Sequence, residues 1–119
     1  MANPSKDKGT KAEVAALTIV NRYYPLAKRN PPAGSKDVGD IGGVPFTVIE
    51  VKDQAIYNIP AWMRETEVER VNADALTGIL VVKPKGIGYP QAGHWWAIRP
   101  LAEVLRDHKL LQEYRVGTR

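Results

Sequence analysis

The sequence contains no cysteine, and it has two histidines among its 119 residues. The lack of cysteine excludes disulfide bonds and thiolate metal sites, so any metal ion must be held by oxygen or histidine ligands. His94 and His108 lie far in sequence from the acidic residues described below, and we expect ordinary surface or strand-end positions for both. A metal site in this chain is therefore expected to be built from carboxylates.

Long apolar runs are also missing, since none approaches the roughly 18–20 residues that a membrane span needs. The first eight residues, MANPSKDK, are polar and lack the apolar stretch of a signal peptide. These absences predict a cytoplasmic, intracellular protein. Hydrophobic residues make up 44% and charged residues 25% of the chain, as in ordinary globular proteins. A length of 119 residues predicts one domain over residues 1–119.

Positive charge exceeds negative charge, and the formal net charge is +4. This balance suits a polyanionic partner, although many basic proteins bind nothing acidic. Basic residues gather near the predicted loops and the ends of predicted elements, at Lys6, Lys8, Lys11, Lys28, Arg29, Lys36, Lys83 and Lys85. For any one of them an ordinary solvated side chain is an equal alternative. Together they suit a surface that follows the DNA backbone with salt-sensitive affinity.

Apolar spacing and turn signals predict alternating helices and strands. Helices are expected at 10–24, 60–76 and 100–108, and strands at 26–29, 38–41, 44–52, 79–83 and 94–99. Gly42 and Gly43 predict a two-residue hairpin turn. Residues 1–8 are expected to be a disordered basic lead-in, and residues 110–119 receive no assignment. The predicted fold class is α/β, with a mixed central sheet of about five strands flanked by helices.

The strand over 44–52 ends in two charges, Glu50 and Lys52, which share one face because the strand period is two. An exposed ion pair at a strand end is the ordinary interpretation. Three features favour a site: the strand is apolar on both faces, a hairpin would bring Asp40 beside Glu50, and Glu13 lies on the apolar stripe of the first helix. Two neighbouring carboxylates repel unless a cation lies between them, and hard divalent ions such as Mg²⁺ prefer these ligands.

These residue types suit phosphodiester hydrolysis. Mg²⁺ bound by Asp40, Glu50 and the Val51 carbonyl would polarise the phosphate and lower the pKa of a bound water molecule, and Glu13 would complete the metal pocket. Mn²⁺ is expected to substitute. Lys52 would orient the water molecule and stabilise the negative charge that develops on the phosphate.

Other conspicuous residues favour structural interpretations. We expect Glu65, Glu67 and Glu69 to form a solvated helix face with arginines at helical spacing, with a weaker alternative in which one of them helps the metal site. Trp95 and Trp96 are expected in the core, although one of them could instead lie at a dimer interface.

The order of these motifs resembles the PD-(D/E)xK nucleases, and within them the archaeal-type Holliday junction resolvases. The supporting stretches are KGTKAE at 8–13, KR at 28–29, AGS at 33–35, GDI at 39–41 and VIEVK at 48–52, so the resemblance runs from about Lys8 to Arg99. Gly39 stands where the family pattern has proline. Asp37 could supply a ligand instead of Asp40, and the loop before Asp40 is shorter than in the archaeal enzymes.

The resemblance implies a restriction-endonuclease-like core and a homodimer that cuts two opposed strands of a four-way DNA junction. It makes Glu13, Asp40 and Glu50 metal-site acids and Lys52 the catalytic lysine. The expected DNA contacts are Lys8, Lys11, Arg29, Ser35, Lys36 and Gln54. Ser35 would place the scissile strand and Arg29 would contact phosphate. Comparable small nucleases also occur in bacteriophages.

Two alternatives stay open at this stage. One is a related nuclease that acts on flaps, nicks or single strands through the same core. The other is a basic DNA-binding module in which the core is not catalytic. An RNA target is also compatible with metal and phosphate chemistry.

Overall fold

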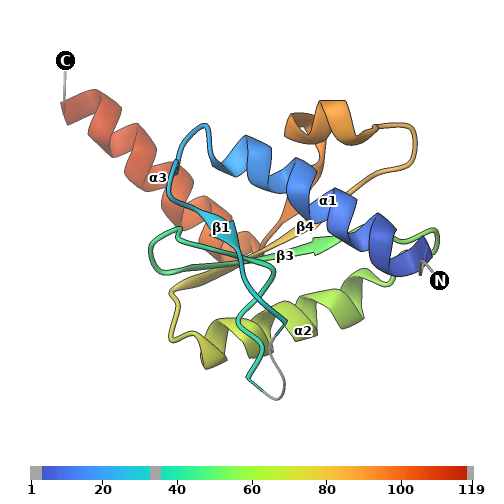
Figure 1. The fold of residues 1–119 in the computed structure, drawn as a ribbon. Helices are drawn as coiled ribbons and strands as arrows, with labels where there is room; N and C mark the ends of the chain where they lie inside the picture. The colour runs from blue at the N-terminus through green and yellow to red at the C-terminus, as the bar shows by residue number, and fades with distance from the viewer. Residues whose placement is uncertain (1–3, 33–35, 118–119) are drawn as a thin grey trace.

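The computed structural model describes residues 4–32 and 36–117. Its elements are α1 (Pro4–Val20), β1 (Lys28–Arg29), β2 (Ile41–Gly42), β3 (Thr47–Lys52), α2 (Ile59–Asn72), β4 (Thr77–Val82), the short 3₁₀ helix η1 (Tyr89–His94), β5 (Trp96–Ile98) and α3 (Leu101–Gly117). The five strands form one mixed sheet in the order β1-β2-β3-β4-β5. α1 lies on one face of this sheet and α2 on the other (Figure 1). The expected α/β fold with a five-stranded mixed sheet is confirmed.

β3 is the middle strand and pairs differently on its two sides. It runs antiparallel to β2, with Ile49 opposite Ile41, and parallel to β4, with Glu50 opposite Leu80. Parallel neighbours require a crossover connection, which α2 supplies. The turn between β2 and β3 spans 43–46, so it is longer than the predicted two-residue turn.

Two apolar cores lie on opposite faces of the sheet. On the α1 face, the small side chains of Ala12 and Ala16 pack with Ile49 and Val51 of β3. On the α2 face, Trp62 packs with Leu80 and Val82 of β4. Because side chains alternate along a strand, Glu50 and Lys52 of β3 point away from the α1 core and toward α2.

The first helix begins earlier than the sequence pattern indicated. Residues 4–8, expected to be disordered, belong to α1, and the Lys8 ammonium lies 3.5 Å from the Asp53 carboxylate just beyond β3. This ion pair ties the first turns of α1 to the sheet. Residues 1–3 of the expected lead-in lie outside the described residues.

The tryptophan prediction is correct for one residue and wrong for the other. Trp95 is buried, and its indole N–H donates to the Ile87 carbonyl at 3.0 Å. Trp96 is 50% exposed, because its strand β5 forms the edge of the sheet. Its ring meets the edge of Tyr57, with 6.4 Å between the ring centres.

α3 extends to Gly117, well beyond the predicted end near His108, and none of its described residues is buried. The exposed apolar side chains along it are Leu101, Val104, Leu105, Leu110, Leu111, Tyr114 and Val116. Figure 1 shows this helix projecting away from the sheet. No helix in the described part of the chain combines the length and the apolar character needed to cross a membrane.

Candidate metal centre

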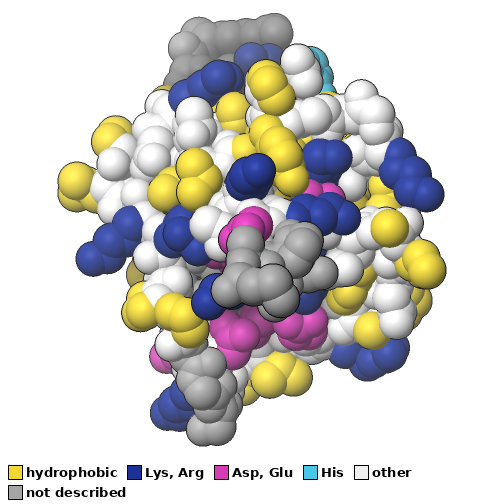
Figure 2. Space-filling view, turned by 45° about the vertical axis from the view of Figure 1, so that its right-hand side comes forward, with side chains coloured by type: hydrophobic (Ala, Val, Ile, Leu, Met, Phe, Trp, Pro, Cys, Tyr) yellow, Lys and Arg dark blue, Asp and Glu magenta, His cyan; other side chains and the backbone are white. Residues whose placement is uncertain are grey.

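Five carboxylates converge beside β3 on the side of the sheet that α2 covers. Asp37 and Asp40 precede β2, Glu50 is on β3, and Glu65 and Glu69 are on α2. We call these five residues the acidic centre. Figure 2 shows acidic side chains gathered in the middle of one face of the molecule, with lysine and arginine side chains around them.

Backbone pairing places Asp40 beside the carboxyl end of β3. The Asp40 N–H donates to the Ile49 carbonyl at 2.8 Å, and Asp40 Oδ2 accepts from the Val51 N–H at the same distance. Burial and then the neighbouring Asp40 carboxylate raise the pKa of Glu50 far above its usual range. The expected proximity of Asp40 and Glu50 is therefore confirmed.

Glu50 and Lys52 do not form an ordinary surface pair. The Glu50 side chain is 4% exposed, and its Oε2 lies 3.2 Å from Lys52 Nζ. Lys52 Nζ also lies 3.0 Å from Glu65 Oε2, so the ammonium joins β3 to α2. Although burial lowers it, the hydrogen bond with Glu65 and the Glu50 carboxylate bring the pKa of Lys52 above its ordinary value. These contacts favour the charged form of the Lys52 ammonium.

Glu69 is the largest departure from the predicted site. It is 1% exposed, so the predicted solvated position is wrong, and neither carboxylate oxygen has a hydrogen-bond partner among the described residues. Burial, followed by repulsion from Asp37, raises the pKa of Glu69 to about 8. The signal for its burial was the helical spacing of Trp62, Thr66 and Glu69, the three buried residues of α2.

The other two glutamates of this group have different positions. Glu67 is exposed and pairs with Arg70 at 2.6 Å, as the helical spacing predicted. Glu65 has an exposed edge but turns toward β3 and binds Lys52. The alternative in which this helix contributes to the metal site is thus the one that the geometry favours.

One carboxylate oxygen from each of Asp37, Glu65 and Glu69 lies within 4.8 Å of the others, so this triad could hold a metal ion. Asp37 is fixed in place by two contacts: its Oδ1 accepts from the Gly39 N–H at 2.8 Å, and its carbonyl accepts from the Asn72 side chain at 2.9 Å. Asp37 and Asp40 are therefore not exchangeable, because Asp37 faces the glutamates of α2 and Asp40 lies beside Glu50.

Glu13 lies at the margin of this centre. Its Oε1 accepts from Arg29 at 3.2 Å, and its pKa is raised by burial and by the nearby Asp40. Arg29, expected to contact phosphate, is thereby held by Glu13. Of the four predicted catalytic residues, Glu50 and Lys52 lie on β3, and Asp40 lies beside Glu50. Glu13 approaches Asp40 from α1.

The predicted DNA contacts fall into separate places. Lys8 and Gln54 line a hollow of about 370 Å³ together with Lys83 and Lys85, which the predicted contact set did not include. This hollow lies at the end of β3, where the Lys83 N–H donates to the Lys52 carbonyl at 3.0 Å, and no member of the acidic centre lines it. Lys11 and Lys36 are exposed, and Ser35 lies outside the described residues.

The backbone at Gly39 would not accept the proline found at this position in the nucleases that the sequence resembles. Its φ is +92°, whereas proline is restricted to about −65°. A Cβ at Gly39 would lie 2.7 Å from Val48 Cγ1 and 2.9 Å from the Ile49 carbonyl oxygen. Glycine therefore permits the close approach that sets Asp40 against β3.

Gly39→Ala is expected to lower the free energy of unfolding by about 1–3 kcal/mol, because it adds a strained backbone conformation and a steric clash. Urea denaturation measures this loss. Gly86→Ala is the matched control, since Gly86 has φ +84° and open space around its Cα. If the two variants lose equal free energy of unfolding, the clash of the added Cβ at position 39 with β3 adds nothing to the cost of the positive φ angle.

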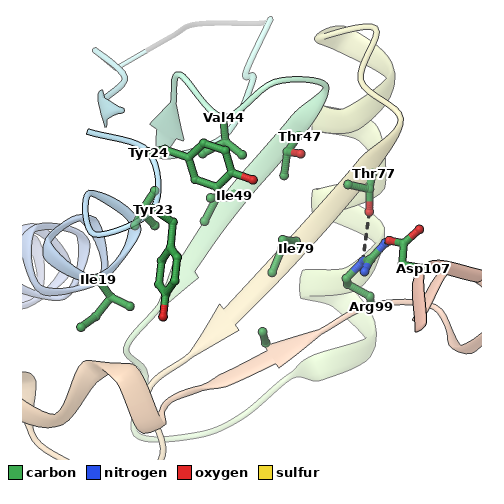
Figure 3. Close-up of a pocket in the computed structure, with 12 residues that line it drawn as sticks. Ile19, Tyr23, Tyr24, Val44, Thr47, Ile49, Thr77, Ile79, Arg99 and Asp107 are labelled. Atoms are coloured by element: carbon green, nitrogen blue, oxygen red, sulfur yellow. Dashed lines mark hydrogen bonds and ion pairs between the residues drawn. The ribbon is translucent and has the colours of Figure 1, made fainter. Parts of the chain in front are cut away.

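The molecule has a larger cavity elsewhere. Figure 3 shows this cavity, about 510 Å³, on the α1 face of the sheet, where Tyr23, Tyr24 and Ile79 line it. At one end Arg99 binds Asp107 at 2.6 Å. No member of the acidic centre lines this cavity, so we assign the candidate chemistry to the acidic centre.

The acidic centre combines ligands for a hard cation with a charged lysine on β3, and a lysine-lined hollow lies at the end of that strand. Such an arrangement can place a divalent cation next to a polyanion. Comparisons of this chain with protein-family models, curated proteins and solved structures gave no match.

Proposed function

We propose that the chain is a Mg²⁺-dependent endonuclease that hydrolyses phosphodiester bonds in DNA, and that its preferred substrate is the four-way junction. The observation that carries this proposal is the convergence of Asp40 and Glu50 with Lys52 at the end of the central strand β3. The restriction-endonuclease-like core implied by the sequence resemblance is part of the same proposal. The mixed five-stranded sheet between helices is compatible with that core.

The donor set fits a hard divalent cation. Glu50 is 3% exposed, and its Oε1 has no hydrogen-bond partner among the described residues. A buried carboxylate oxygen in this state is costly unless a cation or a proton compensates for it. Asp40, Glu50 and the Val51 carbonyl would hold Mg²⁺ or Mn²⁺, which would polarise the phosphate and lower the pKa of a bound water molecule.

The protein groups around this cation have distinct roles. Asp40, fixed by the Val51 N–H, supplies a carboxylate whose position is set by the sheet. Lys52, kept charged by Glu50 and Glu65, would stabilise the negative charge on the attacked phosphate. Glu13 would lie at the margin of the metal site, where it holds Arg29 and adds negative charge next to Asp40.

Positive charge around the acidic centre supports a nucleic-acid substrate. The hollow at the end of β3 is lined by Lys8, Lys83 and Lys85 against one acid, Asp53, which pairs with Lys8. The whole chain has a net charge of +4. Lysine side chains that neutralise phosphates give affinity without base recognition. This suits an enzyme that recognises the shape of branched DNA.

Resolution of a junction requires two cuts, and we propose that a homodimer supplies the two centres. The exposed apolar side chains of α3 support this assembly, since no described residue of that helix is buried within the chain. Most of the stability of helices in proteins comes from tertiary packing of an apolar face. A second copy of the chain would provide that packing.

The test is cleavage of a labelled four-way junction with Mg²⁺, beside flaps, nicked duplex, single strands, linear duplex and RNA. We expect paired, symmetric nicks across the junction and no product with EDTA. Preferred cutting of flaps or single strands would instead assign the related nuclease activity. Tight junction binding without product in Mg²⁺ or Mn²⁺ would show that the module is not catalytic.

A further inference from the structure

We propose that Asp37, Glu65 and Glu69 bind a divalent cation of their own, so that the acidic centre takes up two divalent cations side by side. The first is the cation assigned above to Asp40 and Glu50, and in this respect the inference rests on the proposed function. The second cation is bound mainly by the two glutamates of α2, to which the sequence resemblance gives no role. Its buried ligand is Glu69.

The main observation is the state of Glu69. Its side chain is enclosed at 1% exposure, with both oxygens unpartnered among the described residues, and one of them faces Asp37 and Glu65 within 4.8 Å. Three acidic groups at this spacing repel one another when nothing positive lies between them. A divalent cation would satisfy the buried oxygens and remove the repulsion together.

The nearby donors on the protein are already engaged elsewhere. Lys52 binds Glu50 and Glu65. Arg70 donates to Glu67 and to the Ala75 carbonyl. Asn72, one turn beyond Glu69, donates its side-chain amide to the Asp37 carbonyl. These cationic and amide groups are thus committed to other partners, and Glu50, which also lies beside Glu69, is another acid.

The ligand set defines the class of ion. All three side chains offer oxygen, and the chain has no cysteine. Oxygen ligands favour Mg²⁺, Mn²⁺ or Ca²⁺ over zinc or copper. Glu65 and Glu69 are one helical turn apart on the same face of α2, so both can reach one ion.

Charge balance also favours two cations over one. Carboxylates must release their protons to bind a metal ion. With all five ionised in this way, the acidic centre carries five negative charges, and Lys52 offsets one of them. One divalent cation would leave two negative charges, which protons on the buried Glu50 or Glu69 would then have to offset. Two divalent cations offset the remaining four.

The experiment counts bound Mn²⁺ on the full-length chain without DNA, using the electron paramagnetic resonance signal of free Mn²⁺. We expect two ions per chain for the parent protein, one for Glu69→Gln and one for Asp40→Asn. Glu67→Gln, which alters the exposed glutamate between the ligands, should retain two. One ion in the parent, or two in Glu69→Gln, would overturn the proposal.

Glu65→Gln decides the question if Glu69→Gln fails to fold, because the Glu65 side chain is 43% exposed and its replacement leaves the core intact. It should bind one ion, and retention of two would count against the second site. Because DNA is absent, this count is independent of cleavage. Two bound ions without cleavage would contradict the proposed function alone, whereas cleavage with one bound ion would contradict this inference alone.

Discussion

Glu50→Gln is expected to reduce Mg²⁺-dependent DNA cleavage by at least about 100-fold. Mutating residues that only orient the ligands of a metal ion already lowers metal affinity or activity by about 10–100-fold, and Glu50 would be a ligand itself. The amide keeps the size of the side chain and removes the charge that would bind the cation. Lys52 keeps its contact with Glu65 at 3.0 Å, so the link between β3 and α2 remains. Junction binding, measured in Ca²⁺ by gel shift, should change by less than about threefold because the lysine-lined hollow is untouched.

The same substitution should not lower the melting temperature at pH 8 without divalent ions. Because its pKa is raised, Glu50 must take up a proton when the chain folds at pH 8, and a neutral side chain in its place removes that cost. Glu67→Gln is the control, and it should cleave at the parent rate because Glu67 pairs with Arg70 on the exposed side of α2. Equal cleavage by the Glu50→Gln and parent proteins would exclude Glu50 from the metal site.

The second large effect concerns pH. Without divalent ions, the protein should become less stable as the pH rises from about 5 to 8. Glu69 has a pKa of about 8 in the folded protein, against 4.5 for an ordinary glutamate. Between these values the folded state binds a proton that the unfolded state has released, so the free energy of unfolding falls by about 1.4 kcal/mol per pH unit for this group. The contribution is fully present below pH 4.5 and is lost as the pH rises through 8.

Glu50 adds to this dependence in the same direction, since its pKa is also raised, and it extends the loss of stability above pH 8. Urea denaturation at several pH values in EDTA measures the slope. Glu69→Gln should have a shallower slope between pH 5 and 8, because one of the two groups is gone. A saturating concentration of Mg²⁺ should restore stability at pH 8 through binding to the ionised carboxylates. Stability that rises with pH in EDTA would contradict the assignment.

The arrangement around β3 could be predicted because it depends on local pattern. The period of two places Glu50 and Lys52 on one face, and the glycines after Ile41 indicate an antiparallel neighbour that brings Asp40 close. The mixed sheet of five strands followed from the order of helical and strand patterns. These features need no knowledge of how distant segments pack.

The contribution of α2 could not be read in the same way. We expected the three glutamates to share a solvated helix face, and Glu67 does lie there. Glu65 and Glu69, one turn apart, share another face. Which side of the helix meets the sheet depends on tertiary packing, and here the stripe of Trp62 and Thr66 brings Glu69 inward. The extent of α3 was missed for a related reason, since a helix without a buried face gives a weak periodic signal.

The crossover from β3 through α2 to β4 has a consequence for how the acidic centre forms during folding. Glu50, Lys52, Glu65 and Glu69 all belong to this one continuous segment. Contacts between residues that are near in sequence close short loops and so form early. Asp40 is as near in sequence, since its contact with Val51 spans 11 residues and the contact of Lys52 with Glu65 spans 13, so all the like charges come together within one stretch of the chain. A cation present at that moment would act as a folding ligand, independently of any role in chemistry.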